Sequence, residues 1–282
     1  MRSARIVGRL KALSPVFHGG NEKTGNVVLL NRLKFVVGDE VVDVPIINGN
    51  AVRGRLRRLV MRDLLEQIGF ELDLGDKRHQ KLYHTLFAGG VLTAAESESE
   101  VGAIDLSFKS RLVKIPPIAL FGLSYSNQMI EGRLKVGHLL PICKELEEYT
   151  GVKSNISFYQ LITRAFQTRR DELRGGERGE EDEEDEGEET VQMIVEYEAF
   201  AAGTEFYHEM FVEGANDLLL SALARAVELF KQSPYIGGKS AVGFGKLKIE
   251  YDLDATPDLY LKYLDEHAGE IKETLQELMK RL

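Results

Sequence analysis

The sequence predicts an α+β protein with a ferredoxin-like core of the RNA-recognition type, in which strands and helices follow the order βαββαβ and large insertions enlarge the core. Three observations support this prediction. A loosely alternating N-terminal stretch precedes an amphipathic helix, two long alternating runs precede a second helix, and a last strand follows that helix. The 282 residues suffice for one elaborated domain or two small ones.

The N-terminal quarter contains the first strand and the first helix of this order. Residues 4–15 alternate loosely and predict a strand that runs into a glycine-containing turn at 17–21. Short apolar runs between residues 27 and 44 predict a hairpin. Apolar residues at helical spacing over 50–68 predict a helix with one buried face, and Asn50 is placed to cap its first turn.

The middle of the chain is interpreted as an insertion over residues 70–160 with a small structure of its own. Residues 81–87 and 139–149 predict helices, whereas 103–108 alternate and predict a strand. Pro116-Pro117 excludes a regular central strand, because proline cannot donate to a ladder of backbone hydrogen bonds.

The C-terminal part supplies the second half of the core. Residues 191–213 form two alternating runs around Ala202-Gly203 and predict a long hairpin. A helix over 218–231, a strand over 246–251 and an amphipathic terminal helix over 257–282 follow.

Charge is distributed unevenly along the chain. The net charge is −9, yet residues 177–189 alone contain ten acids and one arginine, while residues 1–62 contain twelve Lys/Arg against four Asp/Glu. This asymmetry favours a polyanionic partner. Residues 175–190 are too acidic and too poor in apolar residues to order themselves, so they are expected to form a disordered loop, either solubilising or mimicking nucleic acid.

Composition excludes several protein classes. The single cysteine, Cys143, excludes an internal disulfide and fits a reducing compartment. No apolar run reaches the length needed to span a membrane. A cytoplasmic protein without membrane contact is therefore expected.

The first helix is the strongest candidate for binding an anion. Five arginines occupy its first three turns, where the helix dipole is positive and free backbone N–H groups are expected: Arg53, Arg55, Arg57, Arg58 and Arg62. Arg53 and Arg57 are one turn apart at the border of the apolar face and are predicted to share a phosphate, whereas Arg55, Arg58 and Arg62 fit a solvated face. Gly54 costs about 1 kcal/mol in a helix interior, which indicates close approach of a ligand or another strand.

A glycine-rich loop over residues 237–245 is the second candidate. It has four glycines in nine residues. Such loops let backbone N–H groups converge on an anion, and Lys239 adds a positive charge. The spacing is not that of a nucleotide-binding P-loop. A tight connection between a helix and a strand needs the same residues, so that alternative stays open.

Together these two motifs carry a resemblance to a known family. Residues 49–57, GNAVRGRLR, resemble the (G)SSLKGALR motif in the first helix of the CRISPR RAMP superfamily, and residues 237–245 resemble its C-terminal glycine-rich loop, usually GGxxxxGFG. The turn at 18–20 and the chain length resemble the backbone subunits of that superfamily, the Cas seven group. Residues 192–195 and 202–204 resemble the type IV branch.

The resemblance implies a right-hand-shaped protein. The palm would comprise residues 1–69 and 191–256, the fingers 70–160, and the thumb or linker 161–190, with 257–282 as a C-terminal helix. It implies a non-catalytic backbone subunit that binds guide RNA (crRNA) by its phosphates, with copies stacked head to tail and bases free to pair with target DNA or RNA. Other effector-complex subunits would be partners, and no cofactor is expected.

The motifs and the basic run before the acidic loop predict a set of RNA-binding residues. These are His18, Asn50, Arg53, Gly54, Arg57, Arg169, Arg170, Gly237, Gly238, Lys239, Ser240, Gly243 and Gly245.

The sequence also offers three alternatives to a non-catalytic RNA-binding subunit. Type III relatives cut target RNA with an aspartate after the first strand, but here Glu22 is the only acid in residues 18–32, which makes metal-assisted cleavage unexpected. A guide-processing endoribonuclease would use His18 as general base, with Lys23 or Lys34 stabilising charge. A zinc-stabilised module would use four residues at loose spacing: His79, His84, His138 and Cys143.

Overall fold

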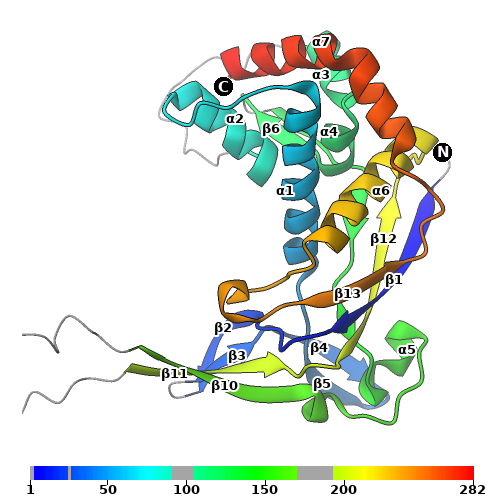
Figure 1. The fold of residues 1–282 in the computed structure, drawn as a ribbon. Helices are drawn as coiled ribbons and strands as arrows, with labels where there is room; N and C mark the ends of the chain where they lie inside the picture. Colours follow the sequence, from blue (N-terminus) through cyan, green and yellow to red (C-terminus); the bar gives the residue numbers. More distant parts are fainter. Residues whose placement is uncertain (1–2, 25–26, 91–104, 127, 170–192) are drawn as a thin grey trace, which may run out of the picture.

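The computed structural model describes residues 3–24, 27–90, 105–126, 128–169 and 193–282. At its centre is a five-stranded antiparallel sheet in the order β13-β1-β12-β8, with β9 also pairing with β12 (Figure 1). These strands are β1 (Ala4–Ala12), β8 (Leu134–Val136), β9 (Leu140–Pro141), β12 (Glu205–Val212) and β13 (Leu247–Tyr251).

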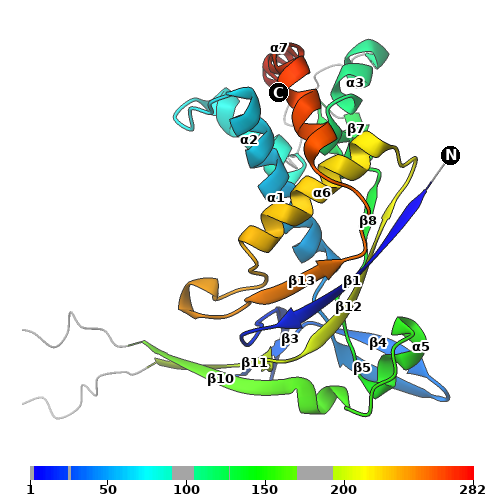
Figure 2. The same cartoon turned by 45° about the vertical axis from the view of Figure 1, so that its right-hand side comes forward.

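Two long helices cover one face of this sheet. They are α1 (Gly49–Ile68) and α6 (Asp217–Gln232), which Figures 1 and 2 show side by side. Along the chain the elements follow as β1, α1, β8, β12, α6 and β13. Leu10 of β1 lies between Phe206 of β12 and Ile249 of β13, the two neighbouring strands. These three side chains and the apolar face of α1 belong to the same hydrophobic core. The predicted first strand, first helix, second helix and last strand are confirmed.

Residues predicted to form a separate insertion contribute to this same core. Besides β8 and β9, the segment contributes three helices: α2 (Lys77–Ala88), α3 (Leu106–Val113) and α4 (Pro116–Phe121). Together with the terminal helix α7 (Asp258–Lys280), they pack around α1 and α6. The helix predicted over 81–87 lies within α2, and α7 matches the predicted terminal helix.

Two predictions for this segment are wrong. Residues 106–108 are helical rather than extended, because Asp105 caps α3 by accepting a 2.9 Å hydrogen bond from the N–H of Phe108. The helix predicted over 139–149 is interrupted, because Leu140 and Pro141 pair with β12. Only the short pieces η1 (Lys144–Leu146) and α5 (Glu147–Thr150) are helical there.

A second sheet of four strands has the order β10-β11-β3-β2. Its members are β2 (Gly19–Thr24), β3 (Val27–Leu30), β10 (Ile162–Arg169) and β11 (Met193–Phe200). The hairpin predicted over 191–213 is wrong, because β11 belongs to this sheet whereas β12 belongs to the central one. The chain changes sheets at Ala201–Gly203, where Gly203 N–H donates to the carbonyl of Ala12 at 2.7 Å.

Three smaller elements complete the described structure. β4 (Arg32–Val37) and β5 (Glu40–Pro45) form a hairpin, which rests on a small core of Val44, Cys143, Leu146 and Phe158. β6 (Leu123–Tyr125) pairs with β7 (Gln128–Ile130), and η2 (Phe158–Leu161) precedes β10. None of the helices in the described ranges is long and apolar enough to span a lipid bilayer. The acidic loop predicted over 175–190 lies outside the described residues.

Candidate nucleic-acid interface

The start of α1 is capped by Asn48 rather than by the predicted Asn50. The Asn48 side chain accepts a hydrogen bond from the N–H of Asn50 at 2.9 Å, and its carbonyl accepts the N–H of Ala51 at 2.9 Å. Asn48 has extended backbone angles, as a capping residue requires, whereas Asn50 is already helical. The predicted cap lies two residues too late in the chain.

Two histidines satisfy the remaining N–H groups at this end of α1. Nε2 of His18 accepts from the N–H of Asn48 at 3.1 Å, and Nδ1 of His138 accepts from the N–H of Gly49 at 3.0 Å. A bound anion would therefore not meet free N–H groups here, and that expectation is wrong. Burial lowers the pKa of His18, which favours the neutral ring that this contact needs.

Arg53 and Arg57, expected to share a phosphate, instead bind the end of α4. Arg53 donates to the carbonyl of Phe121 at 2.7 Å, and Arg57 donates to the same carbonyl and to that of Gly122 at 2.8 Å. Both guanidinium groups lie 5.8 Å from the centre of the Phe121 ring. Arg57 is only 5% exposed. Its burial, followed by the charge of Arg53, lowers its pKa to about 10.

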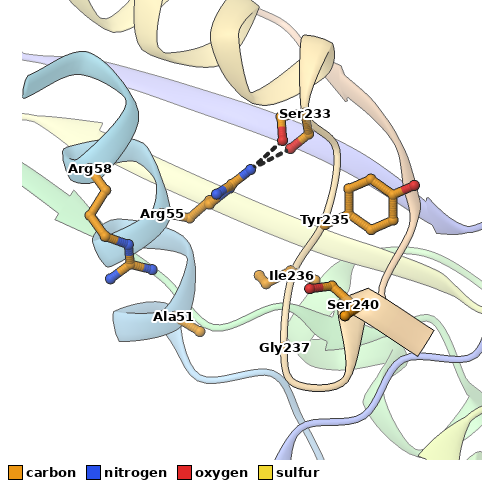
Figure 3. A pocket seen from close by; sticks show the side chains of 9 residues that line it. Ala51, Arg55, Arg58, Ser233, Tyr235, Ile236, Gly237 and Ser240 are labelled. Carbon is orange, nitrogen blue, oxygen red and sulfur yellow. Dashed lines mark hydrogen bonds between the residues drawn. The ribbon is translucent and has the colours of Figure 1, made fainter. Parts of the chain in front are cut away.

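Arg55 and Arg58 lie beside the glycine-rich loop; Arg58 is exposed, as expected of a solvated face, whereas Arg55 is partly buried. With the end of α6 and that loop they enclose a pocket of about 620 Å³ (Figure 3). Arg55 donates to the carbonyl and hydroxyl oxygens of Ser233 at 2.9 and 2.5 Å. The pocket is lined by Ala51, Arg55, Arg58, Ser233, Tyr235, Ile236, Gly237, Ser240 and Ala241.

Positive charge accumulates along this side of α1. Burial lowers the pKa of Arg55, and the charges of Arg58 and Arg62 lower it further. In the described part of the chain, none of these three arginines forms a salt bridge. An anion entering the pocket would relieve their mutual repulsion.

The sequence also contains a pattern that indicates this side of α1. Ala51, Arg55, Arg58 and Arg62 recur at i, i+4, i+7 and i+11, so they form one stripe along the helix. Tyr235 also lines the pocket, but no spacing pattern in the sequence indicates it.

The glycine-rich loop is held by the turn that follows β1. Gly238 N–H donates to the carbonyl of Phe17 at 2.9 Å, and Gly245 N–H donates to that of Pro15 at 2.8 Å. Gly237 and Gly245 have φ angles of 79° and 84°, and a Cβ atom at either position would collide with a backbone carbonyl. The need for a tight connection therefore accounts for these two glycines.

The rest of the loop is less constrained. Gly243 has a φ angle of 93° and ends the short helix η4 (Ser240–Val242), with no atom within 4 Å of its added Cβ. Ser240 is exposed and lines the pocket.

Lys239 is directed to the second sheet and is not part of the pocket lining. Its Nζ donates to the side-chain oxygen of Gln167 at 2.9 Å and lies 4.2 Å from the centre of the Tyr197 ring. Arg169 ends β10, but its side chain and the whole of Arg170 lie outside the described residues.

The zinc alternative is not supported by the four residues on which it rested. His79 accepts the N–H of Asp73 at 3.0 Å, and His138 is engaged with α1. Cys143 is buried, which raises the pKa of its thiol to about 12. Among the described residues, no three side chains of the types that bind metals are grouped as a metal site requires.

Comparisons with known proteins agree with this architecture. The family model described as "RAMP superfamily" matches residues 9–248. A solved structure titled "Type IV-B CRISPR Complex" contains a chain that superposes with a TM-score of 0.61 at 19% sequence identity, covering 89% of this chain and 92% of that one. At that identity, the likeness concerns the fold. No curated protein matches the sequence.

Proposed function

The chain belongs to the RAMP superfamily, and on that premise we propose that it is a non-catalytic backbone subunit of a type IV CRISPR effector complex. Copies assemble head to tail along the guide RNA, hold it by its phosphates and leave its bases free to pair with a target. Other subunits of the complex are its partners, and the assembly works in the cytoplasm.

One observation carries this proposal. Arg55 and Arg58 lie beside the glycine-rich loop, and none of the three arginines of the stripe, Arg62 included, has a carboxylate partner among the described residues. From Arg55 to Arg62 the stripe extends roughly 10 Å along the helix axis, so it suits a run of phosphates better than a single ion. Guanidinium groups bind phosphate oxygens through paired N–H donors. Because these contacts are with the phosphates of the RNA backbone, the protein binds RNA independently of the RNA sequence.

The hand-like architecture of the backbone subunits is part of the same proposal. The order β13-β1-β12-β8, with α1 after β1 and α6 after β12, supports a ferredoxin-like palm. The elements within residues 70–160 form the fingers, and some of them join the palm core. The thumb begins with β10, which pairs with β11 and projects with it from the lower part of the molecule in Figure 1.

Arg53 and Arg57 take a positioning role in this proposal. By holding the carbonyls at the end of α4, they fix α1 against the fingers. His18 and His138 likewise fix the first turn of α1. Direct phosphate contacts come from Arg55, from Arg58 and from exposed backbone of the loop.

The test replaces both pocket arginines, Arg55→Ala with Arg58→Ala. RNA affinity falls by a similar factor for unrelated sequences, and the slope of log affinity against log salt becomes shallower by about 1–2. Fluorescence anisotropy with short single-stranded RNAs at several salt concentrations measures both.

The matched control is Lys248→Ala with Lys262→Ala, which removes the same charge from exposed positions on β13 and α7. An equal loss of affinity in the control would mean that net charge, not the pocket, governs binding. An unchanged affinity in the arginine variant would overturn the proposal.

A further inference from the structure

The tip of the β4–β5 hairpin presents an apolar and acidic surface without a partner. Val36 and Val41 are cross-strand neighbours and are 61% and 66% exposed. Between them lie Asp39 and Glu40, both exposed and neither in a salt bridge with a described residue. The tip is held in place, because the hydroxyl of Tyr149 donates to the carbonyl of Val36 at 2.7 Å.

A pocket of the opposite character lies beside α1, on the side that faces α4. It has a volume of about 560 Å³ and combines the basic groups of Arg53, Arg57 and Lys135 with apolar side chains. Met129, at its rim, is 75% exposed. Phe121 forms part of its lining.

Positive charge in this second pocket is only partly neutralised within the described structure. Lys135 meets Glu131 at 2.6 Å and Glu213 at 3.6 Å, but neither Arg53 nor Arg57 forms a salt bridge there. The Nε atom of Arg57 is buried and has no hydrogen-bond partner. Unpaired buried cations are costly, so a carboxylate brought close to this pocket would be stabilising.

The two surfaces lie at different ends of the molecule. In Figure 1 the hairpin lies at the bottom of the molecule, whereas α2, β6 and α4, which contribute to the second pocket, lie in the upper half. A contact that joins one end of a chain to the other end of the next is heterologous, and it repeats along a filament when the rotation between copies does not close a ring.

We propose that the tip of the β4–β5 hairpin of one copy inserts into the pocket between α1 and α4 of the next copy. Val36 and Val41 pack against Met129 at the rim of the pocket, and the carboxylates of Asp39 and Glu40 approach the basic groups of the pocket. The argument for a second copy as the occupant is complementarity, since both charge and polarity match between the two ends of one chain. This inference rests on the proposed head-to-tail assembly and names the surfaces that form it.

Cysteine pairing tests the contact directly. Glu40→Cys and Lys135→Cys are placed in the same chain, the protein is loaded on long RNA, and mild oxidation is followed by non-reducing electrophoresis. The double variant gives a ladder of covalent oligomers, whereas a mixture of the two single variants gives dimers only. Buried Cys143 remains in all variants and does not contribute.

The matched control replaces Glu40→Cys by Glu250→Cys, an exposed acid on the edge strand β13. That variant, paired with Lys135→Cys, gives no ladder. A ladder of equal intensity in the control, or none in the test variant, would overturn the inference.

Binding of a short RNA that accommodates one copy is measured on the same variants. Normal affinity without a ladder overturns the hairpin contact and leaves the proposed RNA site standing. Charge reversal adds a second measurement: Glu40→Lys lowers assembly on long RNA by roughly tenfold or more, and adding Lys135→Glu to the same chain restores it. Failure of the second change to restore assembly would also count against the contact.

Discussion

Gly54 lies one helical turn before Arg58, and a Cβ atom added to it would stand 3.3 Å from Nη1 of that arginine. The three nearest atoms all belong to the Arg58 guanidinium. Among the described residues, no strand therefore requires the glycine. The remaining explanation from the sequence, close approach of a ligand, leads to a prediction with two opposite effects.

Gly54→Ala is expected to stabilise the protein and to weaken RNA binding. The free energy of unfolding rises by about 0.5–1 kcal/mol, because alanine is the better helix former and the guanidinium can move aside. RNA affinity falls because the methyl group and the displaced Arg58 occupy the ligand's path. Urea unfolding and RNA titration measure the two effects, and higher stability with unchanged affinity would contradict the ligand explanation.

Gly49→Ala is expected to destabilise the protein. Its Cβ atom would stand 2.5 and 2.6 Å from the carbonyl oxygens of Gly137 and Val136, which are backbone atoms of the β8 end and cannot turn away. Such overpacking costs about 1–3 kcal/mol, measured as a lower urea midpoint. Gly269→Ala on α7 is the control, because nothing lies within 4 Å of its added Cβ and stability should rise. Equal effects of the two substitutions would contradict the close contact.

Acid is expected to destabilise the protein through His208. The ring is fully buried, with Nε2 3.1 Å from the carbonyl of Gly137 and Nδ1 2.8 Å from the hydroxyl of Tyr251. Burial lowers the pKa of His208 to about 4, below the ordinary value of 6.5. Between these values the unfolded chain binds the proton more readily. Stability is therefore complete above pH 6.5 and declines towards pH 4, by roughly 3 kcal/mol.

Urea unfolding at several pH values checks this expectation. His208→Gln, which cannot titrate, flattens the pH dependence even if it lowers stability at every pH. His267→Gln, at a partly exposed histidine of α7, is the matched control. A slope in His208→Gln equal to that of the unaltered protein would show that another group is responsible.

The purified protein is expected to cut neither strand when supplied with guide RNA, complementary target and Mg²⁺. Glu22 is the only acid in residues 18–32, and Nε2 of His18 is engaged by the N–H of Asn48. Gel analysis of both labelled strands tests this, with Glu22→Ala as the companion variant. Cleavage that disappears in Glu22→Ala would show the chain to be a nuclease, because a contaminating enzyme would be indifferent to the substitution.

The sequence by itself determined the elements whose burial follows a local period. Alternation in β1 buries Ile6 and Leu10, and the helical period of α1 buries Leu56 and Val60. The glycine-rich loop and the first-helix motif likewise identified the family, because both lie in short contiguous stretches. Local patterns decide which side of an element is buried.

The tertiary structure alone decided what each side meets. Helix α1 presents Arg57 to the carbonyl of Gly122 and Arg55 to Ser233. These two partners, Gly122 and Ser233, are more than 100 residues apart in the chain. Periodicity places the two arginines on different faces of α1 but does not identify the neighbouring segments. Likewise, alternation in β11 and β12 predicts two strands, yet only the completed packing sends them to different sheets. Contacts between distant segments depend on the global arrangement of the chain, which no local period encodes.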